Sequence, residues 1–183
     1  MAQSPQPLSR RTWLASVLLG SSGLVHAQSA APTESVAARE AKAPALPEVG
    51  STVHVPRLTL LDGQSLDPSA SAAKVTVVYW WASTCPFCAL QSPEMQKLWS
   101  QLHSKGLQML TLSVDKTPQE ATAYLAKKGY TFPAAWVSPE LHKQFPKPRG
   151  LPITFVLDRH GKVLQAEKGQ MFPEDVAQLS QWL

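Results

Sequence analysis

A buried strand that leads into a helix carrying both cysteines constrains this chain more than any other sequence feature. Val75–Trp81 is a continuous run of apolar, β-branched and aromatic residues, which predicts a strand buried on both faces. Cys85-Pro86-Phe87-Cys88 follows it and opens a helix that we expect to reach about Ser104, because Met95–Leu102 places apolar residues three or four positions apart. The pattern therefore predicts a strand, a short turn and a helix, with both thiols at the turn.

The segments after this helix alternate between strand and helix patterns. The expected elements are a strand at Leu107–Val114, a helix from Thr117 to Gly129, a shorter helix opened by Ser138-Pro139-Glu140, a hairpin of Ile153–Leu157 and Val163–Ala166, and a last helix from Phe172 to Leu183. A short edge strand is expected within Val53–Leu61. This order predicts an α/β fold in which a central mixed β-sheet carries helices on both faces.

Residues 1–27 have the order of regions found in secretory signal peptides. Arg10 and Arg11 precede the apolar run Trp13–Val25, and Val25-His26-Ala27 supplies the small residues that a cleavage site needs. Ser9–Leu14 also resembles a twin-arginine signal. We expect export to the periplasm. The alternative, an uncleaved membrane anchor, is disfavoured because the run is shorter than the roughly 20 residues of a spanning helix.

The domain organisation and the net charge follow from this interpretation. Residues 28–48 are rich in Ala, Pro, Ser and Glu without a sustained apolar face, which is typical of a flexible linker, although Ser35–Lys42 can form a short helix. We expect the folded domain to span residues 49–183. Without residues 1–27 the chain keeps 15 of its 17 basic side chains against 13 acidic ones, a net charge of +2 that predicts no nucleic-acid partner.

The two cysteines have the spacing and the placement of a redox pair. They share one face of the predicted helix, so their sulfur atoms can meet, but a bridge across four residues constrains the unfolded chain little. Cys85 falls at the amino end of that helix, where backbone amides and the helix dipole stabilise a thiolate. Cys88 lies one turn deeper and is suited to act as the resolving thiol. The alternatives are a structural disulfide and a copper(I) site of two thiolates.

A second segment makes the pattern specific. Trp81-Ala82-Ser83-Thr84-Cys85-Pro86-Phe87-Cys88, followed by Arg149-Gly150-Leu151-Pro152-Ile153-Thr154-Phe155-Val156-Leu157-Asp158, resembles the thioredoxin superfamily. The chain is most similar to its TlpA/ResA-like members, which are exported thiol–disulfide oxidoreductases. The resemblance covers about Val49–Leu183 and implies a thioredoxin-like fold for that part of the chain.

The resemblance also implies roles for individual residues. Cys85 would be the nucleophile, and Cys88 the resolving thiol that forms the redox-active disulfide with it. Pro152 would be a cis proline that offers the Leu151 backbone to a substrate strand and keeps Cys85 from capturing metal. The implied partners are cysteine-containing protein substrates and a membrane-linked redox partner. We expect no cofactor, no metal site and a monomeric protein.

Two groups of side chains surround the expected pair. An apolar groove is predicted beside Cys85, lined by Trp81, Phe87 and Leu151. Trp81 fits equally well in the core of the domain. Three cations precede the proline, namely Lys143, Lys147 and Arg149. We interpret them as solvated loop charges, and the alternatives are that they stabilise the thiolate or steer an acidic partner.

The sequence departs from this family at positions that usually carry carboxylates. Tyr79 stands where thioredoxins usually have a buried Asp, and Gln91 stands where TlpA/ResA-like proteins often have Glu. Neutral side chains therefore replace both groups that usually help to move the proton of the resolving thiol. The Pro-Phe dipeptide between the cysteines resembles glutaredoxin-type and DsbA-type pairs, which favours a pair less reducing than thioredoxin.

The sequence therefore predicts an exported enzyme that exchanges disulfides with protein cysteines, as a reductase of the TlpA/ResA-like kind. The first alternative is a DsbA-like oxidant, in which the same exchange runs in the opposite direction. The second, from another class, is a copper-binding thiol chaperone, and peroxidase activity is a weaker third.

Overall fold

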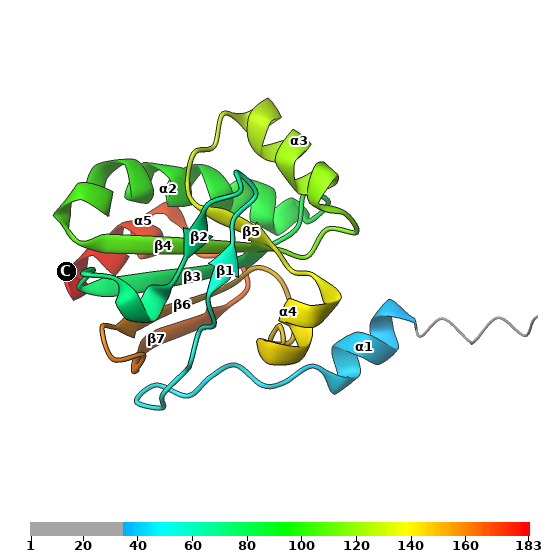
Figure 1. Ribbon diagram of the computed structural model, residues 1–183, viewed down its shortest axis with the longest axis horizontal. Coiled ribbons are helices and arrows are strands. Elements are labelled where there is room, and N and C mark those ends of the chain that lie inside the picture. Colours follow the sequence, from blue (N-terminus) through cyan, green and yellow to red (C-terminus); the bar gives the residue numbers. More distant parts are fainter. Residues whose placement is uncertain (1–34) are drawn as a thin grey trace, which may run out of the picture. The chain divides into compact units, whose positions relative to one another are not determined.

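Five strands form a mixed sheet at the centre of the described part of the chain. The computed structural model describes residues 35–183, so the predicted signal peptide lies outside the described residues. The strand order is β5-β4-β3-β6-β7 (Figure 1), with the bounds β3 Val75–Trp81, β4 Leu107–Ser113, β5 Ala134–Trp136, β6 Ile153–Asp158 and β7 Val163–Lys168. β4 and β5 run parallel to β3, whereas β6 is antiparallel to β3 and β7 is antiparallel to β6. The predicted mixed sheet is confirmed.

The central strand, β3, is buried along its whole length. All seven of its residues are buried, and their side chains enter two different hydrophobic clusters. Val77 and Tyr79 belong to the cluster on one face of the sheet, whereas Val78 and Trp80 belong to the cluster on the other. A strand covered on both faces has no solvent-facing side, which explains why its sequence is a continuous apolar run.

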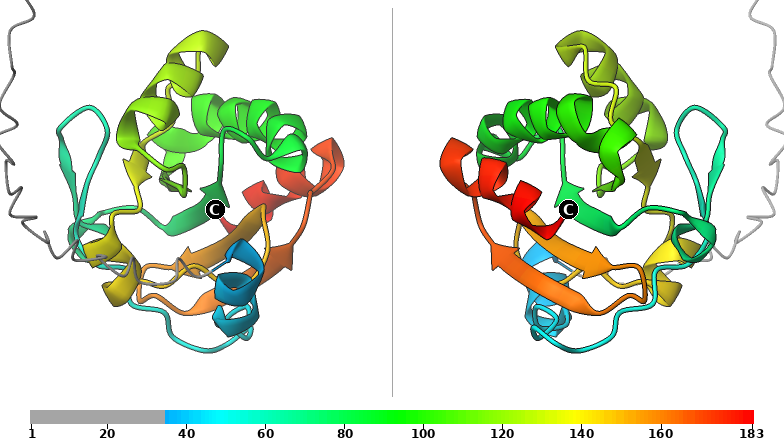
Figure 2. Two further views of the ribbon diagram at one scale, coloured as in Figure 1. Left: turned by 90° about the vertical axis from the view of Figure 1, so that its right-hand side faces the viewer. Right: turned by 90° about the vertical axis from the view of Figure 1, so that its left-hand side faces the viewer.

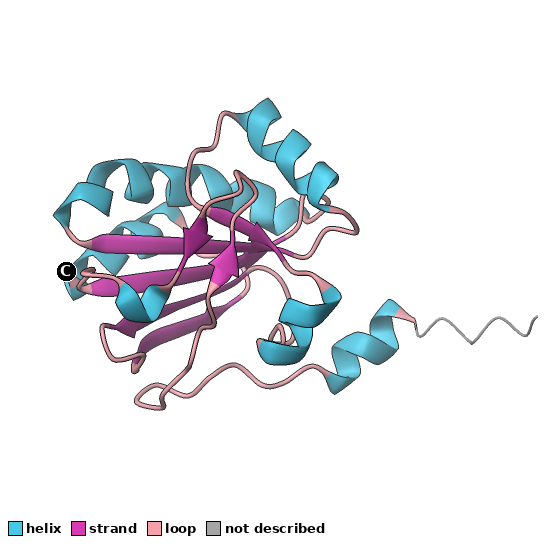
Figure 3. Cartoon of the chain, in the orientation of Figure 1, coloured by secondary structure: helices cyan, strands magenta, loops and turns pink. Residues whose placement is uncertain are grey.

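Helices cover both faces of this sheet, as expected (Figures 2 and 3). Their bounds are α2 Pro86–Leu102, α3 Pro118–Lys128, α4 Pro139–Gln144 and α5 Pro173–Gln178. One face packs against α2, α3 and α5, which supply Met95, Ala121 and Val176 to the first cluster. The other face packs against α4 and the segment before β3, through Leu141 and Leu58.

Local signals set the ends of α3 as predicted. Thr117 is the N-cap residue, and its hydroxyl accepts a hydrogen bond from the Glu120 amide at 3.3 Å. The Glu120 carboxylate in turn accepts the amide of Lys116 at 3.1 Å. The helix ends at Gly129, which has a φ of 68°, a left-handed conformation that glycine adopts without steric cost.

Two short strand regions differ from the prediction, one in the five-stranded sheet and one in a separate two-stranded sheet. β5 was not expected, and it forms by pairing with β4 from Thr111 to Ser113. The edge strand expected within Val53–Leu61 is reduced to β1 (Leu58–Thr59), which pairs with β2 (Ser65–Leu66). Because β5 forms only by pairing with β4, which lies more than twenty residues earlier in the chain, its own sequence carries little strand signal.

The segment that precedes the predicted domain is structured in the part that is described. α1 (Val36–Lys42) begins after Ser35, whose hydroxyl accepts the Ala38 amide at 3.1 Å as an N-cap. The short helix that the sequence allows is therefore present, and residues 40–44 hydrogen-bond to the loop before Pro152 instead of forming a free tether. None of the helices within residues 35–183 is long and apolar enough to cross a membrane.

Candidate functional site

The two cysteines lie at the start of α2, directly after the turn that ends β3. Cys85 is the N-cap residue and Pro86 is the first helical residue, a position where the missing amide of proline costs nothing. Cys85 and Cys88 form a disulfide, with their Cα atoms 5.2 Å apart. Cys85 is partly exposed, whereas Cys88 is fully buried. The sulfur of Cys85 is therefore the one that an incoming group can reach.

The backbone amides at the start of α2 surround the sulfur of Cys85. The amide of Cys88 donates a hydrogen bond to Cys85 Sγ, with the nitrogen 3.1 Å from the sulfur. The first turn of the helix contains no acidic side chain. Free amides and the helix dipole make this end of α2 electropositive, so the geometry favours a negative charge on Cys85 after reduction.

A buried carboxylate that the sequence analysis did not single out anchors the turn before Cys85. Asp115, which follows β4, accepts hydrogen bonds from the amide of Ser83 at 2.9 Å and from its hydroxyl at 2.7 Å. The other carboxylate oxygen accepts the hydroxyl of Ser113 at 2.8 Å. The available signal was a polar residue directly after a buried strand, because the carboxyl ends of neighbouring parallel strands such as β3 and β4 meet at one edge of the sheet.

The loop that contains Pro152 lies beside the end of β3. Trp80 and Ile153 are partners in the pairing of β3 with β6, which places the residues before Ile153 next to the turn that leads to Cys85. The peptide bond between Leu151 and Pro152 is cis. Leu151 and Cys85 both pack at the margin of the first hydrophobic cluster. The structure thus brings the two predicted segments together.

Among the described residues, the backbone groups on either side of Leu151 are hydrogen-bonded, whereas those of Leu151 itself are not. The amide of Gly150 donates to the Glu40 carboxylate at 2.9 Å, and the carbonyl of Pro152 accepts the amide of Gly169 at 2.9 Å. Within residues 35–183, the Leu151 amide and carbonyl take part in no such bond. The backbone groups of Leu151 are therefore available to a peptide that lies against this loop.

The three residues predicted to line an apolar groove have different environments. Phe87 is 57% exposed and Leu151 is half-buried. Trp81 is fully buried, and its ring centroid lies 5.4 Å from that of Tyr124. The assignment of Trp81 to a groove is therefore wrong for this structure, because β3 is covered on both faces and its last side chain joins the core.

Neutral hydrogen-bonding groups occupy the region beneath the disulfide. The hydroxyl of Tyr79 lies 3.0 Å from that of Ser92 and donates to the carbonyl of Cys88 at 3.3 Å. Burial raises the pKa of Tyr79 well above its usual value, against the opposing effect of the Ser92 hydrogen bond. Gln91 is fully buried, donates to the Thr154 hydroxyl at 2.8 Å and accepts the amide of Met171 at 2.9 Å.

Two of the three cations before Pro152 are bound to α1 and to their own loop. Lys147 is buried and donates to the carbonyls of Pro148 and Gly150 at 2.8 and 3.0 Å. It also forms an ion pair with Glu40 at 2.7 Å. Arg149 donates to main-chain carbonyls of α1. The expectation of a solvated loop charge is therefore wrong for the buried Lys147, whereas Arg149 is exposed and also hydrogen-bonded to α1.

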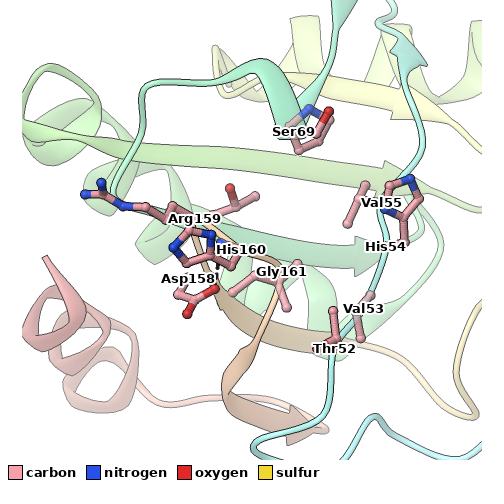
Figure 4. A pocket seen from close by; sticks show the side chains of 12 residues that line it. Thr52, Val53, His54, Val55, Ser69, Asp158, Arg159, His160 and Gly161 are labelled. Carbon is pink, nitrogen blue, oxygen red and sulfur yellow. Dashed lines mark hydrogen bonds between the residues drawn. The ribbon is translucent and has the colours of Figure 1, made fainter.

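A pocket of about 270 Å³ lies at the end of the sheet where β3 begins (Figure 4). The turn Asp158–Gly161 and residues 52–55 line most of it, together with Thr76 near the start of β3. Cys85 follows the other end of β3, so this pocket contains no thiol. Within the described residues, no group of three or more His, Cys, Asp or Glu side chains is placed to hold a metal ion.

Fold and site together define a class of protein. A disulfide at the start of a helix, directly after the central strand of a mixed sheet and next to a loop with a cis proline, characterises a thioredoxin-like fold with a redox pair. Residues 40–183 match the Redoxin family, and the chain belongs to that family. Within the thioredoxin superfamily it is a TlpA/ResA-like protein.

Known relatives agree with this assignment. The chain is 27% identical over 128 residues to the thiol-disulfide oxidoreductase ResA of Geobacillus kaustophilus, covering 70% of this chain and 74% of that protein. ResA of Bacillus thuringiensis subsp. konkukian is 26% identical over 122 residues, covering 65% and 69%. StoA of Bacillus subtilis has a similar fold, with a TM-score of 0.59 at 22% identity, over 74% of this chain and 98% of that one. The protein is a thiol–disulfide oxidoreductase.

Proposed function

We propose that this enzyme is an exported reductase of protein disulfides, with Cys85 as the nucleophile and Cys88 as the resolving thiol. One observation carries the proposal: Cys85 is partly exposed and its Sγ accepts an amide hydrogen bond at the start of α2, whereas Cys88 is buried. The exposed, electropositive position suits the attacking thiolate, and the buried position suits the thiol that acts second.

The proposed reaction transfers two electrons to the substrate. The Cys85 thiolate attacks one sulfur of a substrate disulfide, which forms a mixed disulfide and releases the first substrate thiolate. Cys88 then attacks the sulfur of Cys85, the mixed disulfide breaks, and the Cys85–Cys88 disulfide forms while the second substrate thiol leaves. An external dithiol donor must reduce the enzyme for the next cycle.

The two positions that usually carry a carboxylate to receive the proton of Cys88 hold neutral side chains here. Tyr79 and Gln91 occupy the positions where carboxylates are usual in the family, and Gln91 is hydrogen-bonded on both sides of its amide group. We infer that this proton passes to the departing substrate thiolate, which is a stronger base than either neutral side chain. The resolving step then depends on the chemistry of the substrate thiol.

Leu151 and Phe87 are the proposed contacts of an extended substrate. The free backbone groups of Leu151 fit a peptide that pairs with the loop as an additional strand, and the exposed ring of Phe87 offers an apolar surface next to the sulfur. Cys85 is partly exposed and Phe87 is exposed, which suits contact with a cysteine-bearing protein segment. Pro152 completes the site by placing Leu151 beside Cys85.

We propose that the protein acts in the periplasm, as a monomer that a membrane-linked redox partner keeps reduced. The support is the order of charged, apolar and small residues in residues 1–27. An oxidising compartment also makes a dedicated electron donor necessary, because exported thiols otherwise remain oxidised.

Trapping of a mixed disulfide tests the proposed roles. Cys88→Ser should accumulate a covalent adduct with a cysteine-containing substrate, linked through Cys85 and reversed by dithiothreitol. The matched control, Cys85→Ser, retains one thiol in the same helix and should form no adduct. Equal trapping by both variants, or an adduct at Cys88, would contradict the assignment.

The second candidate is an oxidant that donates its disulfide to substrate thiols. The Pro-Phe dipeptide between the cysteines favours it, since this dipeptide resembles the DsbA-type pair. Incubating the oxidised protein with a reduced dithiol peptide, and the reduced protein with the oxidised peptide, compares the two directions. Faster oxidation of the peptide than its reduction would support the oxidant.

A further inference from the structure

The segment that begins with α1 is attached to the loop before Pro152 by side-chain and main-chain contacts. The carboxylate of Glu40 accepts the amide of Gly150 at 2.9 Å and forms an ion pair with Lys147 at 2.7 Å. The amide of Arg149 donates to the carbonyl of Pro44 at 3.0 Å. Residues more than a hundred positions apart in the sequence are thus joined at the loop that carries Leu151.

Lys147 is buried and requires a charged partner, which Glu40 supplies. Its side chain is only 10% exposed, and its ammonium group donates to the carbonyls of Pro148 and Gly150 as well as to Glu40. A buried ammonium group needs a partner of opposite charge, because the desolvation of an unpaired cation is costly. Glu40 is the acidic partner that the structure gives to Lys147.

The Glu40 carboxylate is held in its charged form. Partial burial opposes ionisation, but the hydrogen bonds from Lys147 and Gly150 and the charges of Lys147 and Arg149 outweigh it. The pKa of Glu40 consequently lies below its usual value. Arg149 adds a second attachment, since its guanidinium donates to the carbonyls of Glu40 and Ala41 at 3.0 and 2.6 Å.

The opposite side of the loop is bounded by β7. Gly150 has a φ of 99°, and a Cβ atom added there would lie 2.9 Å from the side chain of Lys168. The amide of Gly169 holds the carbonyl of Pro152. Leu151 therefore lies between two fixed neighbours, and Glu40 fixes the one that precedes it.

We propose that Glu40 is a positioning residue for disulfide exchange: by holding the Gly150 amide and the Lys147 ammonium group, it fixes the Leu151 backbone where a substrate peptide pairs with it. This inference rests on the proposed function. It predicts that Glu40 matters for substrates that have a backbone and not for small disulfides, since Glu40 touches neither cysteine.

The test compares two substrates with one set of variants of the full chain. The substrates are a disulfide-containing peptide and 2-hydroxyethyl disulfide, which has no peptide backbone. For Glu40→Ala we expect kcat/KM for the peptide to fall about tenfold, the value of one charge-assisted hydrogen bond, through a higher KM with kcat within about twofold. The rate with 2-hydroxyethyl disulfide should stay within about twofold of the wild type.

Two further variants control the experiment. Glu48→Ala removes an exposed carboxylate from the same segment and should leave both rates unchanged. Glu40→Gln keeps an acceptor for the Gly150 amide without the charge, so it should recover part of the peptide KM. Amide hydrogen exchange should show faster exchange at Gly150 in Glu40→Ala than in the wild type and in Glu48→Ala.

Each outcome decides the proposal. Peptide rates that are unchanged in Glu40→Ala, equal losses with both substrates, or an equal loss in Glu48→Ala would overturn it. Faster exchange at Gly150 without an effect on the peptide KM would also overturn it, because the contact would then exist without a role in substrate binding. A wild-type protein that reacts with neither disulfide would instead refute the proposed function itself, which is a different result from a loss confined to the Glu40 variants.

Discussion

Individual side chains beneath the disulfide determine which charges the site can hold. Tyr79 and Gln91 are both fully buried and both hydrogen-bonded, so neither introduces a charge next to Cys88. The raised pKa of Tyr79 keeps its hydroxyl protonated across the physiological pH range. The amides at the helix start therefore act on Cys85 without an opposing charge from either of these two side chains.

The hydroxyl of Tyr79 should contribute to stability. Tyr79→Phe removes its hydrogen bonds to Ser92 and Cys88, and we expect the free energy of unfolding to fall by about 1 kcal/mol. Urea denaturation of the oxidised protein measures this change. Tyr124→Phe is the matched control, because the Tyr124 hydroxyl is buried without a partner among the described residues, and its removal should be neutral or stabilising. A loss in Tyr124→Phe as large as in Tyr79→Phe would contradict this account.

At the scale of elements, the turn between β3 and α2 depends on a contact with the end of β4. Asp115 accepts three hydrogen bonds from Ser83 and Ser113. Since Ser83 lies two residues before Cys85, the carboxylate determines where the helix begins relative to the sheet. The turn is therefore anchored from outside its own sequence.

Replacement of this carboxylate should weaken the turn. Asp115→Asn exchanges an acceptor oxygen for an NH₂ group that faces hydrogen-bond donors, and we expect a loss of about 1–3 kcal/mol in the free energy of unfolding together with slower reaction of Cys85 with a small disulfide. The control is Asp62→Asn in the exposed turn after β1, where Asp62 accepts the Gln64 amide. Its effect should stay within about 0.5 kcal/mol. Wild-type stability and reactivity in Asp115→Asn would refute the anchoring role.

The attachment of α1 should weaken at acidic pH. The pKa of Glu40 is lowered in the folded protein from an unshifted value of 4.5. Its ion pair therefore contributes stability above about pH 4.5, and this contribution is lost as the pH falls through the lower folded-state pKa. The difference in unfolding free energy between the wild type and Glu40→Gln should be largest near neutral pH and shrink below pH 4.5. A difference that grows on acidification would be inconsistent with the observed ion pair.

The sequence predicts those elements whose signals are local. The apolar run of β3 and the Thr117 cap and Gly129 end of α3 are all observed. β5 is missed because its Ala-Ala-Trp sequence becomes a strand only by pairing with β4. The docking of α1 is missed for the same reason, since the pairing of Glu40 with Lys147 joins distant parts of the chain.

Some features of the candidate site can likewise be predicted from the sequence, and others cannot. The spacing of the cysteines and the Leu151–Pro152 step are visible in the sequence, and the structure places both segments at the end of β3. The burial of Trp81 and the role of Asp115 depend on packing and on strand order. Sequence patterns report which faces are apolar, and they do not report which neighbouring element covers a given side chain.

At the scale of the whole molecule, the redox potential depends on how strongly the protein stabilises the reduced cysteine pair relative to the disulfide. Stabilisation of a Cys85 thiolate favours the reduced enzyme, and no carboxylate at position 79 or 91 opposes it. We therefore expect a potential less negative than about −260 mV, above the value of about −270 mV for thioredoxin. Equilibration with glutathione buffers of defined ratio, followed by quantification of the oxidised fraction, measures it. A more negative potential would show that the Pro-Phe pair behaves as a thioredoxin-type reductant.

The ionisation of Cys85 in the reduced enzyme is the most direct test of the account. The rate of alkylation of Cys88→Ser by iodoacetamide, measured against pH, reports the Cys85 thiolate alone. We predict that the alkylation rate of Cys85 reaches half its maximum well below about pH 8.5, which is the pKa of a free cysteine. We also predict slow alkylation of Cys88 in Cys85→Ser at neutral pH. A midpoint at or above about 8.5 for Cys85, or faster alkylation of Cys88, would contradict a nucleophile stabilised at the start of α2.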